Sequence, residues 1–155
     1  MEIILFIGIQ AAGKSTFYKD RFADTHVRIN LDMLKTRHRE KKLFECCLEI
    51  QQSVVIDNTN LTRADRLRYI TSILKERIPL HGFFFATSLE DALDRNRKRG
   101  PHAIPEKGIR GAYKRLEPPS FDEGFSSLSR VEIRNASFLV TPWNSSPGKG
   151  RTVLD

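Results

Sequence analysis

Apolar and polar positions along the chain follow two alternating spacings. Continuous apolar runs of strand length occur at 2–7, 53–57 and 80–86, and a shorter run occurs at 27–30. Between them the apolar residues recur at helical spacing, in the stretches 14–22, about 33–52, 62–77 and 88–99. Apolar strands that alternate with helices are typical of a parallel sheet covered on both faces.

The pattern continues toward the C-terminus. Pro105 suits a first helical turn and Pro118 blocks continuation, which predicts a helix up to Leu116. Two later apolar runs, "SRVEIR" at 129–134 and "SFLVT" at 137–141, predict shorter strands.

These elements make up one predicted domain over residues 1–141. We expect an α/β fold with a four- or five-stranded parallel sheet, helices on both faces and a helical lid at about 88–116. Residues 142–155 are rich in Pro, Gly and Ser and are expected to form a surface tail. Trp143 is expected to pack on the protein surface; contact with a bound adenine is the less favoured alternative.

Composition narrows the class of protein. The apolar run at the start breaks at Gly8 and has no basic segment before it, so neither a signal peptide nor a membrane span is expected. The adjacent Cys46 and Cys47 are too close for an ordinary disulfide, and free thiols favour the cytoplasm or another reducing intracellular compartment. The four histidines have no ligand spacing with one another or with the cysteines, so no zinc site is expected.

The net charge of +7 raises the possibility of a nucleic-acid partner. Five of the cations, however, lie in two short motifs that could bind the phosphates of a nucleotide: Lys14, Arg95, Arg97, Lys98 and Arg99. The run "KTRHREKK" at 35–42 can be a solvated helix face or a patch that follows a nucleic-acid backbone, and the sequence leaves both open.

The segment "GIQAAGKS", Gly8 to Ser15, matches G-x-x-x-x-G-K-[ST] and lies between an apolar strand and a helix. In that context the backbone N–H groups of the turn converge on phosphate oxygens. Lys14 would reach the β- and γ-phosphates of ATP, and the Ser15 hydroxyl would bind Mg²⁺. The pattern therefore predicts a site for a nucleoside triphosphate.

Asp32 follows the second strand, at the edge of the sheet where ligands bind in such folds. Its carboxylate can accept the proton of an attacking hydroxyl group, or it can simply cap the next helix. Position along the chain does not decide between the two roles. Asn58, not a glutamate, follows the strand "SVVID", so a water-activating carboxylate is missing there and an ATP-hydrolysing motor is less favoured.

Four stretches in order, "GIQAAGKSTF", "INLDML", "VVIDNTNLTRADRLRYI" and "RNRKRG", resemble the kinase domain of the polynucleotide 5′-kinases, a family that includes viral and animal polynucleotide kinase/3′-phosphatases. A fifth, "EPPSFDEGFSSL", is similar to the end of the animal kinase domain. The resemblance covers about residues 4–125 and implies a P-loop kinase that transfers the γ-phosphoryl group of ATP to the 5′-OH of DNA or RNA.

The resemblance also implies roles for single residues. Asp32 matches the general base, Asp57 matches an acidic residue on the acceptor side, and Arg99 matches a lid arginine that contacts the donor phosphates. The nucleotide-binding residues would be Gly8, Ala11, Ala12, Gly13, Lys14, Ser15, Thr16, Arg95 and Arg99, and the acceptor would meet Lys35, Asp57, Thr59 and Asn60. Lys14, Asp32 and Arg99 would be catalytic, and Ser15 would bind the metal.

Two positions depart from the family pattern. Leu31 stands where the animal enzymes have an arginine, and Lys35 stands where viral members have an arginine that touches the acceptor. No Asp-x-Asp occurs in the sequence, so the pattern of the fused phosphatase nucleophile is absent. A P-loop kinase of a small hydroxylated metabolite, antibiotic or nucleotide sugar is the alternative, and a nucleotide-binding regulatory module without transfer activity is the second.

Overall fold

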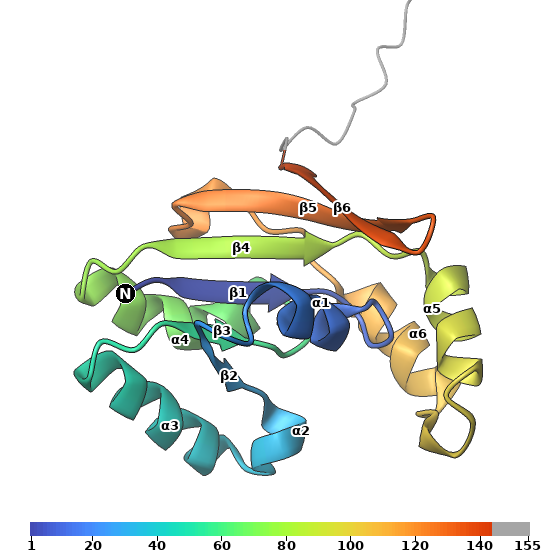
Figure 1. Ribbon diagram of the computed structural model, residues 1–155, viewed down its shortest axis with the longest axis horizontal. Coiled ribbons are helices and arrows are strands. Elements are labelled where there is room, and N and C mark those ends of the chain that lie inside the picture. The colour runs from blue at the N-terminus through green and yellow to red at the C-terminus, as the bar shows by residue number, and fades with distance from the viewer. Residues whose placement is uncertain (144–155) are drawn as a thin grey trace, which may run out of the picture.

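The computed structural model describes residues 1–143, which form one six-stranded sheet with helices around it (Figure 1). The strands are β1 (Ile3–Ile7), β2 (Val27–Ile29), β3 (Val54–Ile56), β4 (Leu80–Phe85), β5 (Ser127–Arg134) and β6 (Ser137–Pro142). The α-helices are α1 (Lys14–Arg21), α2 (Leu31–Leu34), α3 (Arg37–Glu49), α4 (Arg63–Lys75), α5 (Leu89–Arg97) and α6 (Glu106–Arg115). Two 3-10 turns are η1 (Gly100–His102) and η2 (Phe121–Glu123).

The strand order is β2-β3-β1-β4-β5-β6. The first five strands are parallel, which confirms the α/β class, and β6 is antiparallel to β5. The sheet thus has six strands, not the predicted four or five, because the antiparallel β6 joins it at this edge. Only Asn135 and Ala136 connect β5 to β6, with φ of 50° and 59°. A two-residue turn with positive φ forms a hairpin, whereas a parallel neighbour needs a long crossover.

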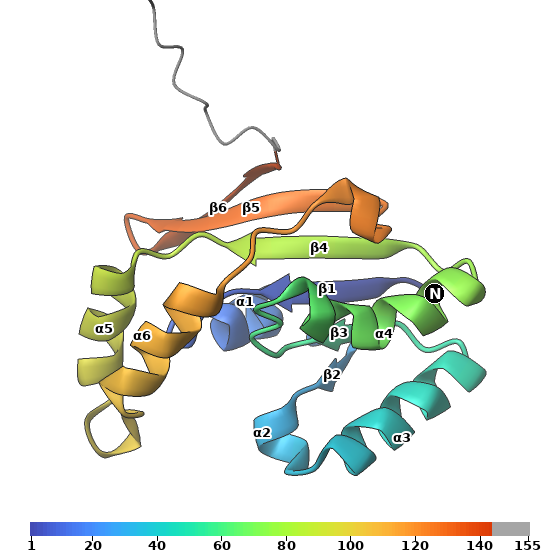
Figure 2. The same ribbon diagram turned by 180° about the vertical axis from the view of Figure 1, so that it is seen from behind.

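The core has two layers because successive side chains of β1 point to opposite faces of the sheet. Ile3, Leu5 and Ile7 pack with residues of α3 and α4. Ile4 and Phe6 pack instead with residues of α1, α5 and α6. Helix α1 accordingly lies in front of the sheet in Figure 1, whereas α4 lies in front of it in the reverse view of Figure 2.

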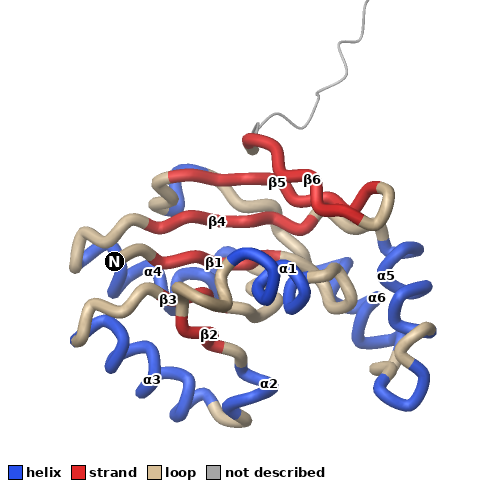
Figure 3. Tube along the Cα trace, in the orientation of Figure 1, coloured by secondary structure: helices blue, strands red, loops and turns tan. Residues whose placement is uncertain are grey.

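The helix predicted over about 33–52 is two helices separated by a turn at Lys35 (Figure 3). Lys35 has a φ of 72°, which interrupts a right-handed helix. Each helix has its own N-cap, since Asn30 accepts from the N–H of Met33 at 2.9 Å and Thr36 accepts from the N–H of Arg39 at 3.2 Å. Asn and Thr are favoured at this position, and the second cap, Thr36, lies inside the charged run at 35–42.

Helices α5 and α6 lie beyond the carboxyl ends of β1 and β4 and form the predicted lid (Figure 1). Ala92, Leu93 and Asn96 of α5 are buried. The helix ends at Arg97, two residues earlier than predicted. Pro101 accounts for this early end, because it lacks an N–H donor and disfavours a helical residue before it.

Trp143 packs edge-on against Phe84 of β4, with ring centroids 4.9 Å apart. Pro142 ends β6, and Trp143 donates its backbone N–H to the carbonyl of Leu128. The rest of the predicted tail, residues 144–155, lies outside the described residues. No helix within residues 1–143 is both long enough and apolar enough to cross a membrane.

Candidate active site

A cavity of about 270 Å³ lies at the carboxyl edge of the sheet, between the phosphate loop, α2, the end of β3 and the lid. It is lined by Gln10, Ala11, Ala12, Gly13, Lys14, Ser15, Thr16, Asn30, Leu31, Asp32, Arg37, Asp57, Asn58, Thr59, Arg99 and Ile104. Parallel sheets commonly bind ligands at this edge. The fold thus brings together residues that are up to 94 positions apart in the sequence, from Gln10 to Ile104.

Two glycines shape the phosphate loop. A Cβ atom on Gly8 would lie 2.9 Å from the Cβ of Phe85, so a larger residue would push the loop away from β4. Gly13 is the N-cap of α1 and has a φ of 88°, which L-residues rarely adopt. No side chain caps α1, so the N–H groups of its first turn face the cavity as donors for an anion.

Lys14 folds back over the loop and donates from Nζ to the carbonyl oxygens of Gly8 (2.8 Å) and Ile9 (2.5 Å). Burial lowers its pKa from 10.5 to about 8. The nearby Asp57 and Asp32 carboxylates raise this pKa, and the positive charge of Arg99 lowers it. Lys14 is therefore an ammonium group that is poorly solvated in the free protein and gains from added negative charge.

Asp32 lies in the first turn of α2, is exposed and lines the cavity. The cap of α2 is Asn30, whose side chain also donates to the backbone carbonyl of Asp57 at 2.6 Å. The alternative role of Asp32, as the helix cap, is therefore wrong. Its carboxylate is left to face the cavity opposite the phosphate loop.

The carboxylate of Asp57 is buried below the loop and contacts Ser15 and Arg28. Its Oδ2 accepts from Ser15 Oγ at 3.5 Å and from Arg28 Nε at 2.8 Å. Arg28 Nη2 lies 2.7 Å from the same oxygen and donates to Ser15 Oγ at 2.8 Å. Asp57, which is predicted to lie on the acceptor side, is in contact with Ser15 of the phosphate loop and lines the cavity.

A hydroxyl and a carboxylate oxygen this close together are ligands that suit Mg²⁺, which takes one or two protein ligands plus substrate phosphates. Ser15 and Asp57 thus fit a metal ion bound with a nucleotide. Within residues 1–143 no cluster of three His, Cys, Asp or Glu side chains could hold a metal without such help.

Sequence reasoning missed Arg28. A single charged residue inside the short apolar run "VRIN" was its only signal.

Arg37 reaches the cavity from the first turn of α3, supported by a buried polar network. Its Nη1 donates to Glu40 Oε1 at 2.8 Å and to the hydroxyl of Tyr69 at 3.2 Å. Asn58 donates to Glu40 Oε2 and to the same hydroxyl, at 2.8 and 3.1 Å. Burial, together with the negative charge of Glu40, raises the pKa of Tyr69 to about 12, so it remains a neutral hydroxyl.

The charged run at 35–42 contains both solvent-facing cations and one cation of the cavity. Lys41 and Lys42 pair with Glu45 on the outer face of α3, as expected for a solvated helix. Arg37 lines the cavity, but Lys35, the predicted acceptor contact, does not. The turn at Lys35 reorients the chain, so that the cavity receives the cation two positions later. Among five cations in eight residues, no sequence signal singled out Arg37.

The lid contributes one of the two predicted arginines. Arg99 lines the cavity from the turn after α5, close enough to affect the pKa of Lys14. Arg95 is half-buried on α5 and does not line it. Both were predicted to bind the nucleotide, but α5 ends at Arg97, so Arg95 lies on the helix and Arg99 lies beyond its end. Arg97 forms ion pairs with Asp94 and Glu106 on the outer surface.

The loop after β3 carries Thr59 and Asn60. The carbonyl of Thr59 accepts from the N–H of Gly8 at 2.9 Å, and Thr59 lines the cavity. Asn60 is buried, has a φ of 47° and donates to the carbonyl of Phe6 at 2.7 Å. Its side chain thus fastens the loop to β1 and does not line the cavity, contrary to the predicted acceptor contact.

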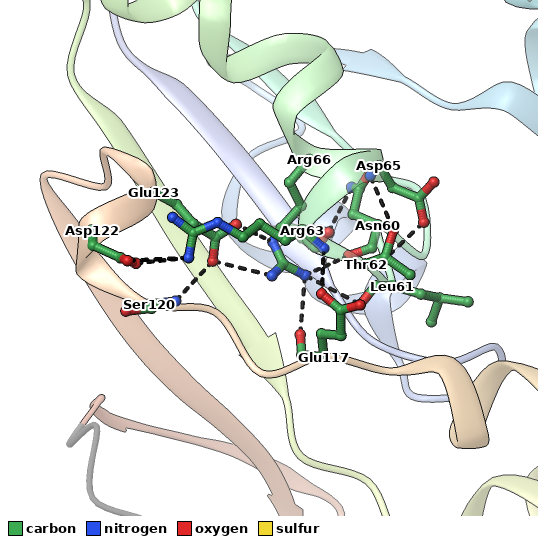
Figure 4. Close-up of polar contacts among 11 residues, drawn as sticks. Asn60, Leu61, Thr62, Arg63, Asp65, Arg66, Glu117, Ser120, Asp122 and Glu123 are labelled. Carbon is green, nitrogen blue, oxygen red and sulfur yellow. Dashed lines mark hydrogen bonds and ion pairs between the residues drawn. The ribbon is translucent and has the colours of Figure 1, made fainter.

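This loop is held from below by the buried ion pair of Arg66 and Glu123 (Figure 4). Arg66 Nε and Nη2 donate to the two carboxylate oxygens at 2.7 and 3.1 Å. Its Nη1 donates to the backbone carbonyls of Asn60, Leu61 and Glu117, at 3.0–3.2 Å. The segment "EPPSFDEGFSSL" thus supports the loop that follows Asp57.

The comparisons with known proteins agree with this geometry. No family model matches the chain. It is 30% identical over 148 residues to the bifunctional polynucleotide phosphatase/kinase of Schizosaccharomyces pombe, a match that covers 92% of this chain and 36% of that protein. A putative bifunctional polynucleotide phosphatase/kinase of Acanthamoeba polyphaga mimivirus is 40% identical over 76 residues, which are 48% of this chain and 18% of that protein. The chain thus spans about a third or less of these relatives.

Solved structures with the same fold include kinases. A gluconokinase from Sinorhizobium meliloti superposes with a TM-score of 0.63 at 19% identity, over 85% of this chain and 82% of that one. The APS kinase of Mycobacterium tuberculosis, solved with AMPPNP and APS, gives a TM-score of 0.56 at 15% identity, over 84% and 87%. The resemblance read from the motifs is confirmed: the chain has the P-loop kinase fold and is a homologue of the bifunctional polynucleotide phosphatase/kinases.

Proposed function

We propose that this protein is an ATP-dependent kinase that transfers the γ-phosphoryl group to the 5′-OH end of DNA or RNA. One observation carries the proposal: three different groups line one cavity. They are Lys14 of the phosphate loop, the carboxylate of Asp32 and the lid arginine Arg99. A protein that only binds a nucleotide needs the loop but neither of the other two groups.

The donor would bind along the phosphate loop, with its phosphates at the N–H groups of the first turn of α1. Lys14 would turn from the carbonyls of Gly8 and Ile9 to the β- and γ-phosphates. Arg99 would approach from the lid and offset the charge on the transferring group. Ser15 and Asp57 would hold a Mg²⁺ ion, which would supply further positive charge to the phosphates.

The acceptor would enter on the side of α2 and α3. Asp32 would accept the proton of the attacking hydroxyl, and its fixed place on a capped helix would align that oxygen with the γ-phosphorus. Arg37 would bind the first phosphate of the acceptor strand, because the Glu40–Tyr69–Asn58 network fixes its guanidinium at the wall of the cavity. No aromatic side chain lines this cavity within residues 1–143, so recognition by base stacking is not favoured.

The test is a panel of acceptors incubated with Mg-ATP, with phosphate incorporation followed by mass. The panel contains a 5′-OH DNA oligonucleotide, a 5′-OH RNA oligonucleotide, a nucleoside with a 3′-phosphate, the same nucleoside without it, and small sugar alcohols. We expect transfer to the oligonucleotides and to the 3′-phosphorylated nucleoside. Transfer only to small alcohols would replace the proposal with a metabolite kinase.

The Arg37→Gln variant sharpens the assay. It should raise KM for the 3′-phosphorylated nucleoside and leave that for ATP unchanged. Lys41→Gln is the matched control, since Lys41 lies on the outer face of α3, paired with Glu45. An equal effect of both variants would show that only general charge attraction is at work.

A further inference from the structure

Arg28 occupies an unusual place for a cation, between the two groups of the phosphate-loop side that suit a metal. It lies in the middle of β2 and its side chain is 25% exposed. Its Nη2 lies 2.8 Å from Ser15 Oγ and 2.7 Å from Asp57 Oδ2, and its Nε also donates to Asp57 Oδ2. One guanidinium therefore holds both oxygens at once.

The same two oxygens are the protein ligands that the proposed function gives to Mg²⁺. They are 3.5 Å apart, which is close to the ~3 Å expected between neighbouring oxygen ligands around an octahedral ion with bonds of ~2.1 Å. Two N–H donors already point at Asp57 Oδ2. A divalent ion needs the lone pairs that these donors use, and its positive charge repels the guanidinium.

We propose that Arg28 competes with the divalent cation for Ser15 and Asp57, so that the cation binds only when the guanidinium moves away. The proposal rests on the proposed function for the identity of the metal site. Without a cation at this site, Arg28 neutralises the carboxylate of Asp57, whose side chain is only 2% exposed. This removes the cost of a buried unpaired charge.

Tyr18 gives the displaced guanidinium a second contact. The Cζ atom of Arg28 lies 5.6 Å from the centre of the Tyr18 ring, within the range of a cation–π interaction. The Tyr18 hydroxyl donates to the carbonyl of His26 at 2.8 Å, which fixes the ring. Arg28 can therefore release the two oxygens, keep its contact with the ring and turn toward solvent.

A fixed structural role for Arg28 makes the opposite prediction. If the guanidinium only supported Asp57, its removal would leave the carboxylate poorly placed and would weaken cation binding. If it competes, its removal exposes two preformed ligands and strengthens cation binding. The sign of the change therefore decides between the two roles.

The test is Mn²⁺ binding to the nucleotide-free full chain, with free Mn²⁺ measured by electron paramagnetic resonance. We expect Arg28→Gln to lower the Kd for Mn²⁺ by at least about fivefold, the low end of typical couplings between ligands. Arg21→Gln is the matched control, because Arg21 is an exposed arginine of α1 paired with Asp20, and it should leave the Kd unchanged. Adding Asp57→Asn to Arg28→Gln should remove the gain.

An unchanged or raised Kd in a folded Arg28→Gln protein would overturn the proposal. If this variant does not fold by circular dichroism, Arg28→Lys decides instead. A lysine is a single point donor and cannot hold both oxygens with a planar fork. The Kd of Arg28→Lys for Mn²⁺ should therefore lie between that of the wild type and the lower value expected when the guanidinium is absent. A Kd for Arg28→Lys equal to or above that of the wild type would also refute competition.

The measurement uses neither ATP nor an acceptor, so its result stands apart from phosphoryl transfer. A lowered Kd with no transfer to any acceptor would refute the proposed function and leave the competition established. Transfer with an unchanged Kd would do the reverse.

Discussion

The side-chain amide of Asn96 forms two hydrogen bonds with the backbone of Ile104. Its Nδ2 donates to the carbonyl at 2.8 Å, and its Oδ1 accepts from the N–H at 2.9 Å. This reciprocal pair closes the lid turn that carries Arg99, and Asn96 is only 2% exposed. The position of Arg99 over the cavity therefore depends on an amide three residues earlier.

Replacing Asn96 by Ala should loosen this turn. The N–H and the carbonyl of Ile104, which are partly buried, lose their partners, so we expect the free energy of unfolding to fall by about 1–3 kcal/mol. The amide of Ile104 should lose protection in hydrogen exchange, which reports the turn directly. Lys98 is an exposed residue of the same turn, so Lys98→Ala is the control. It should leave the free energy of unfolding and the protection of the Ile104 amide unchanged. Unchanged protection of Ile104 in the Asn96 variant would contradict this account of the lid.

Arg99→Ala should lower kcat far more than Arg97→Ala. An arginine that contacts the transferring phosphoryl group contributes about 10³–10⁵-fold. Arg97 is a close control, because it is a nearby arginine whose guanidinium is paired with Asp94 and Glu106 away from the cavity. Steady-state kinetics with the acceptor identified by the panel would measure both variants. Equal losses would remove Arg99 from the site.

Asp32→Asn should abolish transfer and spare the binding of ATP. The amide keeps the size of the side chain but cannot accept the proton, and general bases contribute about 10²–10⁴-fold. Because the cap of α2 is Asn30, the helix itself should be unaffected. Calorimetry would measure the affinity for ATP, and a rapid-quench assay the transfer step. Full activity in this variant would refute the role of base.

Binding of ATP at pH 8 should take up protons at Lys14. Its pKa of about 8 leaves about half of the side chains neutral at that pH, and the phosphates of a bound nucleotide raise the pKa again. We therefore expect an uptake of up to about half a proton. Calorimetry in two buffers of different protonation enthalpy would measure it. Lys14→Arg keeps a permanent charge and should show none.

The same depressed pKa has an effect on stability with a defined sign. Between pH 8 and 10.5 the unfolded chain holds a proton on Lys14 that the folded protein has lost. Stability contributed by this group therefore rises with pH across that window, since the unfolded state binds more protons. Urea unfolding of the wild type and of Lys14→Met at pH 7.5 and 9.5 would isolate the contribution of Lys14. The free energy of unfolding of the wild type, relative to that of Lys14→Met, should be higher at pH 9.5 than at pH 7.5.

Arg66→Ala should be strongly destabilising, because it leaves the Glu123 carboxylate buried without a partner. Loss of one member of a buried pair costs about 3–5 kcal/mol. The exposed pair of Arg63 and Asp122, in the same region, is the control, and its removal should change stability little. Denaturant unfolding would compare the two. Equal effects would mean that the buried pair contributes no more than a surface one.

The elements of the sheet and the phosphate loop could be predicted from the sequence because each depends on local pattern. Continuous apolar runs, the spacing of Gly8, Gly13 and Lys14, and the position of Asp32 after a strand are all read within a few residues. Two of the places where the fold departs from prediction are also local. The cap at Thr36 and the two-residue turn at Asn135 were present in the sequence but were outweighed by longer patterns around them.

Only the tertiary structure decided which side chains meet at the cavity. Arg28 contacts Asp57, 29 residues away, and Arg37 takes the place expected of Lys35 because one backbone turn redirects the chain. Arg95 and Asn60 do not line the cavity, although their motifs suggested contact. The physical reason is that side-chain direction depends on where elements end and how they pack. The sequence determined the kind of chemistry through short motifs, and the packing of distant segments determined which residues carry it.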